Sequence, residues 1–273
     1  MLTAARPALA NSAHWYHPDG SPCFEVPRAD GNGMRNTDLR DARKLGLLPS
    51  VTTIQQVLSK PGLTNWIVEQ NILAIVTAPD VPGETLHDKV KRVLPDADQE
   101  RDAAASVGTR VHAALANIFL NIDMPVDPDI AVMVGAGYRE IKKFMDEKEL
   151  TVVAAEEKMV GHGFAGCTDL VLSGFACFYV LDFKTCKTTD KEKKLTGWPE
   201  HRSQLGAYAA LWCLRHNLDP LSVSTANVYI STTQPGRCEI VQHEDWRADY
   251  AGFRAMFDVW CWLKGYTPNG VVK

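Results

Sequence analysis

The sequence lacks the long apolar runs that mark membrane and secreted proteins. No uninterrupted apolar stretch reaches the roughly 18 residues that a bilayer-spanning helix needs, and residues 1–15 contain no apolar segment of signal-peptide length. Repeats and low-complexity tracts are also absent, and the composition excludes a disordered or collagen-like chain. These absences predict a globular protein of the cytoplasm with no membrane partner.

The cysteines are widely scattered along the chain. The seven cysteines are odd in number and form no C-x-x-C pair, so the spacing typical of a zinc site is missing. A disulfide framework is not expected for such a pattern in a cytoplasmic protein. We therefore expect reduced thiols, most of them buried.

Basic charge is not in excess. The chain has 273 residues, with 29 Lys and Arg against 33 Asp and Glu, which gives a formal net charge of −4. This balance excludes a basic protein that coats nucleic acid over its whole surface, but it leaves local basic patches open. With 45% hydrophobic and 23% charged residues, the chain can form one large domain or two small ones.

The first half of the chain is predicted to be irregular and then helical. Residues 1–48 are turn-rich, with a short hairpin expected between residues 14–16 and 23–26. A helix capped by Ser50 or Thr52 follows, then a second apolar helix over residues 64–76. Pro95-Asp96 predicts a break before a long helix over residues 98–119.

The hydrophobic period changes from helical to strand-like near residue 150. After a helix at about 128–149, three consecutive strands are expected, and a helix, a strand and a final helix follow them. This order predicts an α/β (α+β) fold in which helices sandwich a sheet. The expected strands are 151–160, 165–173, 177–184 and 225–232, and the later helices are 200–216 and 245–264.

Two acidic residues stand in otherwise apolar strands. Asp182 and Lys184 lie two positions apart near the end of one strand, so their side chains project from the same face. Asp169 lies on the preceding strand, which is expected to be its antiparallel neighbour. Two carboxylates forced together repel each other, and a divalent cation is the usual relief. The alternative is a surface ion pair between Asp182 and Lys184.

A third acid comes from the strand before these two. Glu156 and Glu157 are successive residues, so on a regular strand only one of them faces the site. If Val153, Ala155 and Met159 share a face with Glu157, that glutamate projects from an apolar face and needs a partner. Strand alternation therefore favours Glu157.

Taken in order, these residues form a longer series. It comprises G-T-x-x-H ending at His112, a glutamate, G-x-T-D ending at Asp169, D-x-K from Asp182, and Q-x-x-x-Y from Gln204 to Tyr208. The series resembles the RecB-type branch of the PD-(D/E)XK nuclease superfamily over residues 105–232. Upstream, residues 48–53 look like the segment that precedes the core in phage-type and mitochondrial genome maintenance-type exonucleases.

The resemblance implies a restriction-endonuclease-like core with a central mixed sheet flanked by helices. We place this core at residues 98–273. Residues 1–97 would be a helical N-terminal extension, a hairpin plus helices packed on the core.

The resemblance also implies metal-dependent hydrolysis of DNA. His112, Asp169, Asp182 and the Phe183 carbonyl match metal-binding positions, and Glu157 matches an additional acid. Oxygen ligands with one imidazole suit one or two Mg²⁺ or Mn²⁺ ions. Lys184 would position or deprotonate the attacking water, and Gln204 would orient that lysine or the phosphate. Tyr208 would brace its helix or contact the DNA backbone.

The sequence departs from the family pattern in two ways. Thr168 replaces the proline of the family name, which leaves the Asp169 carboxylate unaltered. Some relatives hold an iron–sulfur cluster with one early and three late cysteines, whereas here only Cys238 and Cys261 are late, and they are far apart. We predict no cluster.

DNA contacts are expected from local basic residues. The segment after the Asp182–Lys184 strand carries several lysines, and a solvated charged loop is the equal alternative for it. Basic residues of the N-terminal region form a second candidate patch. The predicted DNA-binding residues are Tyr208, Lys187, Lys191, Lys193, Lys194 and Arg35.

The leading functional prediction is a DNA exonuclease that acts on duplex ends or single strands in recombination, repair or phage DNA processing. Its expected location is the cytoplasm of a bacterial or phage-infected host cell, and its candidate protein partner is a single-strand annealing or binding protein. A structure-specific endonuclease of the same fold is the first alternative. A catalytically silent DNA-binding relative is the second, although a dead site is expected to have lost a ligand.

Overall fold

A computed structural model describes residues 14–58, 61–190 and 198–269. The chain divides into two compact units, of which one contains the sheet and the other, over Leu58–Thr109, is helical. This division does not follow the expected boundary at residues 97/98. Residues 14–57 group with the sheet, although we assigned them to the extension.

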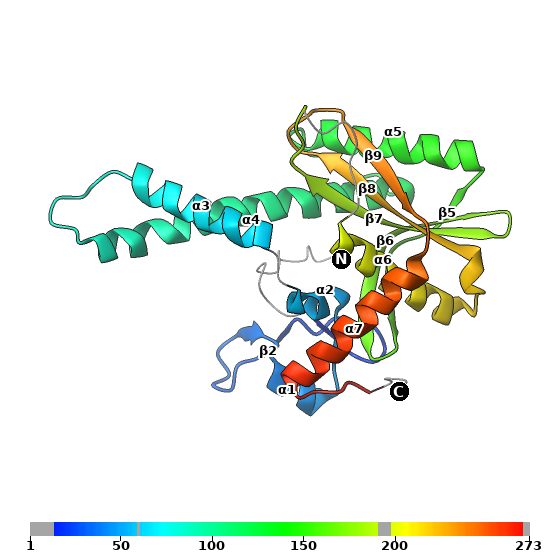
Figure 1. The fold of residues 1–273 in the computed structure, drawn as a ribbon, viewed down its shortest axis with the longest axis horizontal. Coiled ribbons are helices and arrows are strands. Elements are labelled where there is room, and N and C mark those ends of the chain that lie inside the picture. The colour runs from blue at the N-terminus through cyan, green and yellow to red at the C-terminus, as the bar shows by residue number, and fades with distance from the viewer. Residues whose placement is uncertain (1–13, 59–60, 191–197, 270–273) are drawn as a thin grey trace. The chain divides into compact units, whose positions relative to one another are not determined.

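The sheet is five-stranded and mixed, with strands in the order β5-β6-β7-β8-β9 (Figure 1). Neighbours are antiparallel except β7 and β8, which are parallel because α6 connects them. The predicted α/β fold with a central mixed sheet is therefore confirmed. The strands are β5 (Thr151–Gly161), β6 (Phe164–Gly174), β7 (Cys177–Cys186), β8 (Val223–Ser231) and β9 (Cys238–His243).

Helices cover both faces of this sheet. On β8, the Tyr229 hydroxyl pairs with His201 of α6 (Pro199–His216), whereas the next residue, Ile230, contacts α5 (Ala131–Lys148) beside Gly137. Successive strand residues point to opposite faces, so α5 and α6 lie on opposite sides. The last helix, α7 (Trp246–Lys264), packs on α6. Strand β9 was not predicted from the sequence.

The N-terminal segment completes the core on the α6 side. Apolar residues of β1 (Trp15–Tyr16) and α2 (Val51–Ile54) belong to one buried cluster with residues of α7. Leu48 of β4 (Leu48–Pro49) packs instead with Tyr16 and Ala165. Ser50 caps α2, as expected, and accepts from the Thr53 backbone N–H at 3.0 Å.

The hairpin expected near the N-terminus forms in part: Tyr16 and Pro22 make an antiparallel bridge, and the Cys23 N–H donates to the Trp15 carbonyl at 2.8 Å. The regular strand pairs lie elsewhere. β1 pairs with β4, while β2 (Glu25–Pro27) pairs with β3 (Met34–Asn36). Helix α1 (Leu39–Leu45) follows β3, and the 3-10 turns η1 (Gln55–Val57) and η2 (Pro220–Ser222) are the remaining short elements of the sheet-bearing unit.

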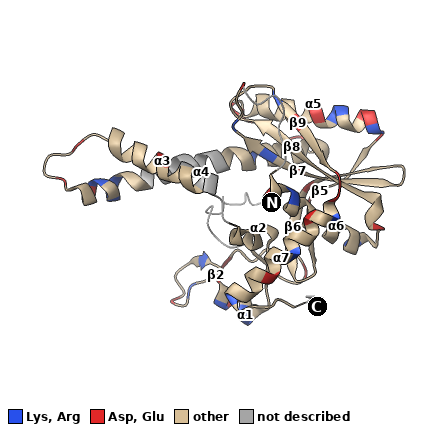
Figure 2. Cartoon of the chain, viewed as in Figure 1, with Lys and Arg blue, Asp and Glu red and all other residues tan. Residues whose placement is uncertain are grey.

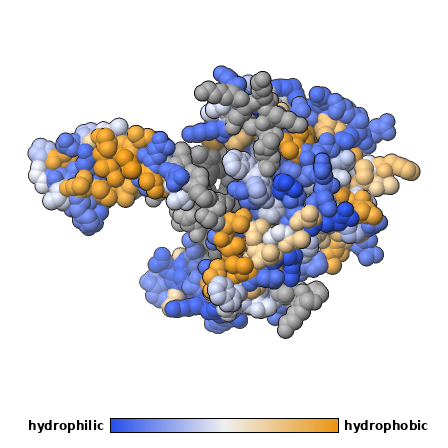
Figure 3. Space-filling model, viewed as in Figure 1, coloured by the Kyte–Doolittle hydropathy of each residue, from blue (hydrophilic) through white to orange (hydrophobic). Residues whose placement is uncertain are grey.

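The helical unit contains α3 (Pro61–Thr77) and most of α4 (Leu86–Phe119). The break expected at Pro95-Asp96 is absent, because α4 continues through it. Among the described side chains of α3, four apolar ones are exposed, and Figure 3 shows an apolar surface on this unit. They are Val68, Ile72, Leu73 and Val76. In the described residues, no helix combines the length and apolarity that a bilayer crossing requires.

Candidate active site

The site forms where strands β6 and β7 separate. Their regular pairing ends at Leu170 opposite Leu181. Beyond this point, side chains replace the backbone ladder: the Thr168 hydroxyl donates to the Leu181 carbonyl at 3.3 Å, and Asp169 Oδ2 accepts from the Phe183 N–H at 2.5 Å. The N–H and C=O of a strand residue point to the same side, so the Phe183 carbonyl also faces this opening.

Asp182 is the most buried acid of the site, with 2% of its surface exposed. Its Oδ2 atom lies 2.6 Å from Lys184 Nζ and accepts from Asn227 Nδ2 at 2.9 Å. Asp182 and Lys184 share a face of β7, as their spacing predicted. Burial raises the pKa of Asp182, and the charge of Asp169 adds to this, although Lys184 opposes it.

His112 of α4 brings an imidazole to the second acid. Its Nδ1 lies 3.3 Å from Asp169 Oδ1, and its ring packs edge-on against Phe183. Burial disfavours the charged imidazole, but Asp169 and Asp182 outweigh burial and raise the pKa of His112. Burial also opposes the charge of Asp169, yet His112 and Lys184 lower the pKa of that carboxyl. The pKa of Asp182 is thus raised while the pKa of Asp169 is lowered, so the two carboxyl groups differ in acidity.

Helix α6 supplies the polar residues that support Lys184. Gln204 Oε1 accepts from Lys184 Nζ at 3.0 Å, and Gln204 Nε2 donates to the Tyr208 hydroxyl at 2.8 Å. Tyr208 is buried, so it braces Gln204 and offers no surface for a DNA backbone. This corrects its assignment as a DNA contact. A Cβ at Gly166 would lie 2.6 Å from the Tyr208 ring, which explains the glycine of the G-x-T-D series.

The structure places Glu156, and not Glu157, beside Asp169. The β5–β6 register sets Ala155 opposite Leu170 and Glu157 opposite Thr168, which leaves Glu156 opposite Asp169. Although Glu156 keeps surface exposed, its pKa is raised by burial and then by the charge of Asp169.

Glu157 instead forms an ion pair outside the cluster. Its Oε1 lies 2.7 Å from Arg215 Nη2 at the end of α6. Our expectation assumed regular alternation, but β5 is irregular between Val152 and Ala154, and Glu156 adopts a positive φ of 52°. This backbone turns the strand, so the residue predicted from alternation faces away from the site.

Two further residues of the cluster were missed by sequence reasoning. Asn227 is fully buried on β8 opposite Asp182, and its Oδ1 lies 2.8 Å from His243 Nε2 on β9. A polar residue inside the apolar run of residues 225–231 was the available signal, because a buried amide needs partners. His243 gave no signal, since β9 itself was not predicted.

The predicted DNA-binding residues are only partly described. Lys191, Lys193 and Lys194 lie outside the described residues, whereas Lys187 follows β7 directly. Arg35 forms a bidentate ion pair with Asp41, at 2.6 and 2.9 Å. Asp41 in turn forms the capping box of α1 with Asp38. The Arg35 guanidinium is therefore engaged in local structure. On α5, both basic and acidic residues are present (Figure 2), and Lys142 and Lys143 pair with Asp146 and Glu147 on the same helix.

The donor types of the cluster suit a hard divalent cation. Two carboxylates, an imidazole and a backbone carbonyl lie around the opening. Burial, and then the charge of Asp169, raise the pKa of Asp182, and a bound cation would stabilise the charge of such a carboxylate. Among the described residues, no three His, Cys, Asp or Glu side chains already form a ligating group. Instead, Lys184 and His112 neutralise the two carboxylates.

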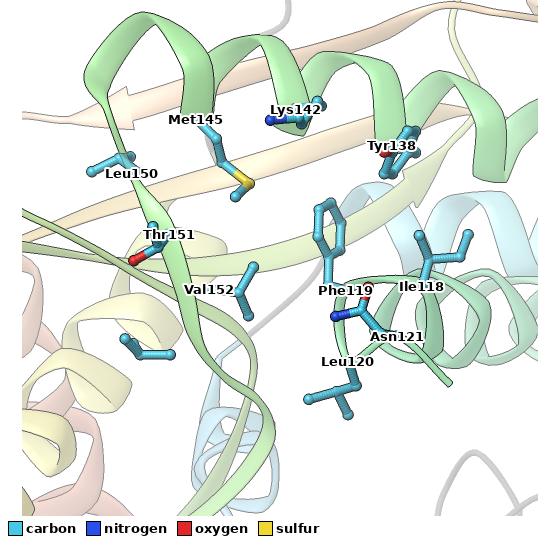
Figure 4. A pocket seen from close by; sticks show the side chains of 11 residues that line it. Ile118, Phe119, Leu120, Asn121, Tyr138, Lys142, Met145, Leu150, Thr151 and Val152 are labelled. Atoms are coloured by element: carbon cyan, nitrogen blue, oxygen red, sulfur yellow. The ribbon is translucent and has the colours of Figure 1, made fainter. Parts of the chain in front are cut away.

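A pocket of about 680 Å³ lies elsewhere on the sheet-bearing unit. Figure 4 shows its lining from the end of α4, from α5 and from the start of β5. Phe119, Tyr138 and Met145 are among its side chains, and none of the predicted catalytic residues lines it. The acid cluster and this pocket are therefore separate features.

No family model and no curated protein matches the chain. Among solved structures, it is similar to a putative exonuclease from Eubacterium rectale, with 12% identity, a TM-score of 0.39, and coverage of 65% of this chain and 75% of that one. It is also similar to an alkaline exonuclease from Laribacter hongkongensis, with 14% identity, a TM-score of 0.33, and coverage of 82% and 94%.

Proposed function

We propose that the protein is a divalent-metal-dependent deoxyribonuclease that hydrolyses phosphodiester bonds at DNA ends. The observation that carries this proposal is the convergence of Asp169, Asp182 and Lys184 at the opening between β6 and β7. Two acids and a lysine there, with His112 beside them, form a set that can hold a cation and a water next to a phosphate.

His112, Asp169, Asp182 and the Phe183 carbonyl would hold Mg²⁺ or Mn²⁺. When bound, such an ion polarises the phosphate and lowers the pKa of water. Glu156 takes the place that we expected for Glu157, since it lies opposite Asp169.

Lys184 is the residue that we assign to the attacking water. Gln204 accepts one of its N–H groups and Asp182 another. No described residue accepts the third, so it can donate to water or to a phosphate oxygen. Gln204 is in turn held by Tyr208, which limits where the ammonium group can lie. The ion pair with Asp182, at 2.6 Å, also holds the ammonium group at the opening.

The test is degradation of linear and covalently closed circular DNA with Mg²⁺, with Mn²⁺ and with EDTA. Metal-dependent loss of linear DNA with intact circles supports the exonuclease. Cutting of circles favours the endonuclease that we retain as the alternative. Binding of either DNA without cleavage under any metal contradicts the proposal and favours a silent relative. Substrates labelled at each end then give the polarity.

A further inference from the structure

A row of polar side chains, two of them buried and the third partly buried, crosses three neighbouring strands beside the site. Asp182 on β7 lies opposite Asn227 on the parallel strand β8. Asn227 reaches His243 on the edge strand β9, where His243 pairs in register with Thr225, two residues before Asn227. The three side chains therefore lie on one face and form a continuous chain of hydrogen bonds.

The donor and acceptor groups of these three side chains set the direction of each hydrogen bond between them. A carboxylate can only accept, so the Asn227 amide must present its NH₂ group to Asp182. Its oxygen then faces His243, and His243 must donate from Nε2. A reversed amide would place two acceptors together in a fully buried position, which is costly. His243 thus selects the amide orientation that Asp182 needs.

The two carboxylate oxygens of Asp182 differ in their hydrogen-bond partners. Asn227 and Lys184 both approach Oδ2, at 2.9 and 2.6 Å. Within the described residues, no hydrogen bond engages Oδ1. The carboxylate is therefore held by one oxygen, and the other is left to a ligand.

We propose that Asn227 and His243 are positioning residues: His243 fixes the amide of Asn227, and Asn227 fixes the carboxylate of Asp182 so that Oδ1 is presented to the catalytic cation. This rests on the proposed function for the cation, but the hydrogen-bond order itself does not. His243 lies beyond the ligand set and acts only through Asn227. Partners of this kind orient metal ligands from outside.

The variants His243→Leu and His243→Gln distinguish the loss of the hydrogen bond that orients Asn227 from the loss of side-chain packing. Leucine removes the donor, whereas the glutamine amide can restore an N–H near the place of Nε2. Trp246→Phe is the matched control, because it removes another buried ring N–H donor, the 2.8 Å hydrogen bond to the Val223 carbonyl on β8. Thermal unfolding of each variant measures the structural cost alone.

The first readout needs neither metal nor DNA. In protein labelled with ¹⁵N at asparagine, the side-chain NH₂ signal of Asn227 is identified by its absence from Asn227→Leu. We expect slow hydrogen exchange of this group in the wild type and in His243→Gln, and fast exchange in His243→Leu. Equal exchange in the wild type and His243→Leu would overturn the role of His243 in orienting the amide.

The second readout is Mn²⁺ binding, measured from the signal of free Mn²⁺ by electron paramagnetic resonance. We expect His243→Leu to weaken binding about tenfold and His243→Gln to stay within about threefold of the wild type. Trp246→Phe should unfold at lower temperature and bind Mn²⁺ normally. Binding that falls equally in His243→Leu and Trp246→Phe would show a general loss of stability and overturn the positioning role.

These readouts also separate the inference from the proposed function. A wild type that binds Mn²⁺ but leaves all DNA intact contradicts the nuclease, while the variant series still decides the positioning role. A wild type that binds no Mn²⁺ contradicts the presentation of Oδ1 to a cation. The exchange of the Asn227 amide then decides only whether the hydrogen-bond order is correct.

Discussion

Strands β7 and β5 both carry acidic residues toward the site, but only β7 keeps a regular backbone through them. On β7, Asp182 and Lys184 are two apart and their charged atoms lie 2.6 Å from each other. On β5, the positive φ of Glu156 interrupts the alternation, and the acid predicted to face the site pairs with Arg215 instead. Alternation thus places a side chain only where the strand is unbroken.

The largest expected effect belongs to the regular strand. Asp182→Ala and Lys184→Ala should each abolish cleavage of linear DNA while DNA binding survives, because each removes a group at the reacting centre. Cleavage is followed on end-labelled DNA, and binding by a mobility shift in EDTA. Asp258→Ala, at an exposed acid of α7, is the control and should cut normally. Undiminished cleavage by Asp182→Ala would remove the site assignment.

The next effect compares the two successive glutamates of β5. Glu156→Gln should reduce cleavage about ten- to hundredfold, because its carboxylate lies opposite Asp169 and can assist the cation. Glu157→Gln should cut like the wild type, since its carboxylate pairs with Arg215. Initial rates at several Mn²⁺ concentrations measure both. A larger loss in Glu157→Gln would restore the assignment made from alternation.

The regular parts of the molecule could be predicted from the sequence. The strands that carry Asp169 and Asp182 were expected as antiparallel neighbours, and β6 and β7 are paired in this way. The helix with Gln204 and Tyr208 was also expected, and spacing of four put both residues on one face. These predictions succeeded because hydrophobic period and helix geometry act locally.

The rest depends on contacts that no local pattern carries. Pro95 lies inside α4, where proline rules predict a break. Strand β9 is an edge strand with little buried surface, so its pattern is weak. Asn227 becomes informative only once β8 is known to lie parallel to β7, because the register then sets it opposite Asp182. The crossover from β7 through α6 to β8, and not the hydrophobic periodicity of either strand, brings Asn227 beside Asp182.

A smaller effect tests the backbone of β5 apart from its charge. Glu156→Asn and Glu156→Ile both remove the carboxylate, but asparagine tolerates a positive φ whereas a β-branched residue does not. We expect the isoleucine variant to have a free energy of unfolding lower by about 1–3 kcal/mol than the asparagine variant. Urea denaturation measures the difference. Equal stabilities would mean that β5 is regular in solution, and the distinction between β5 and β7 would fail.

The smallest effect concerns the ion pair that holds Glu157 away from the site. Arg215 is about half exposed, with 48% of its side chain accessible, so Arg215→Ala should lower the free energy of unfolding by less than about 1 kcal/mol. Cleavage should be unchanged. Because Arg215 and Glu157 share one pair, the double variant with Glu157→Gln should lose less stability than the two single changes added together. Additive losses, or a fall in cleavage with Arg215→Ala, would place Glu157 nearer to the chemistry than its pairing with Arg215 indicates.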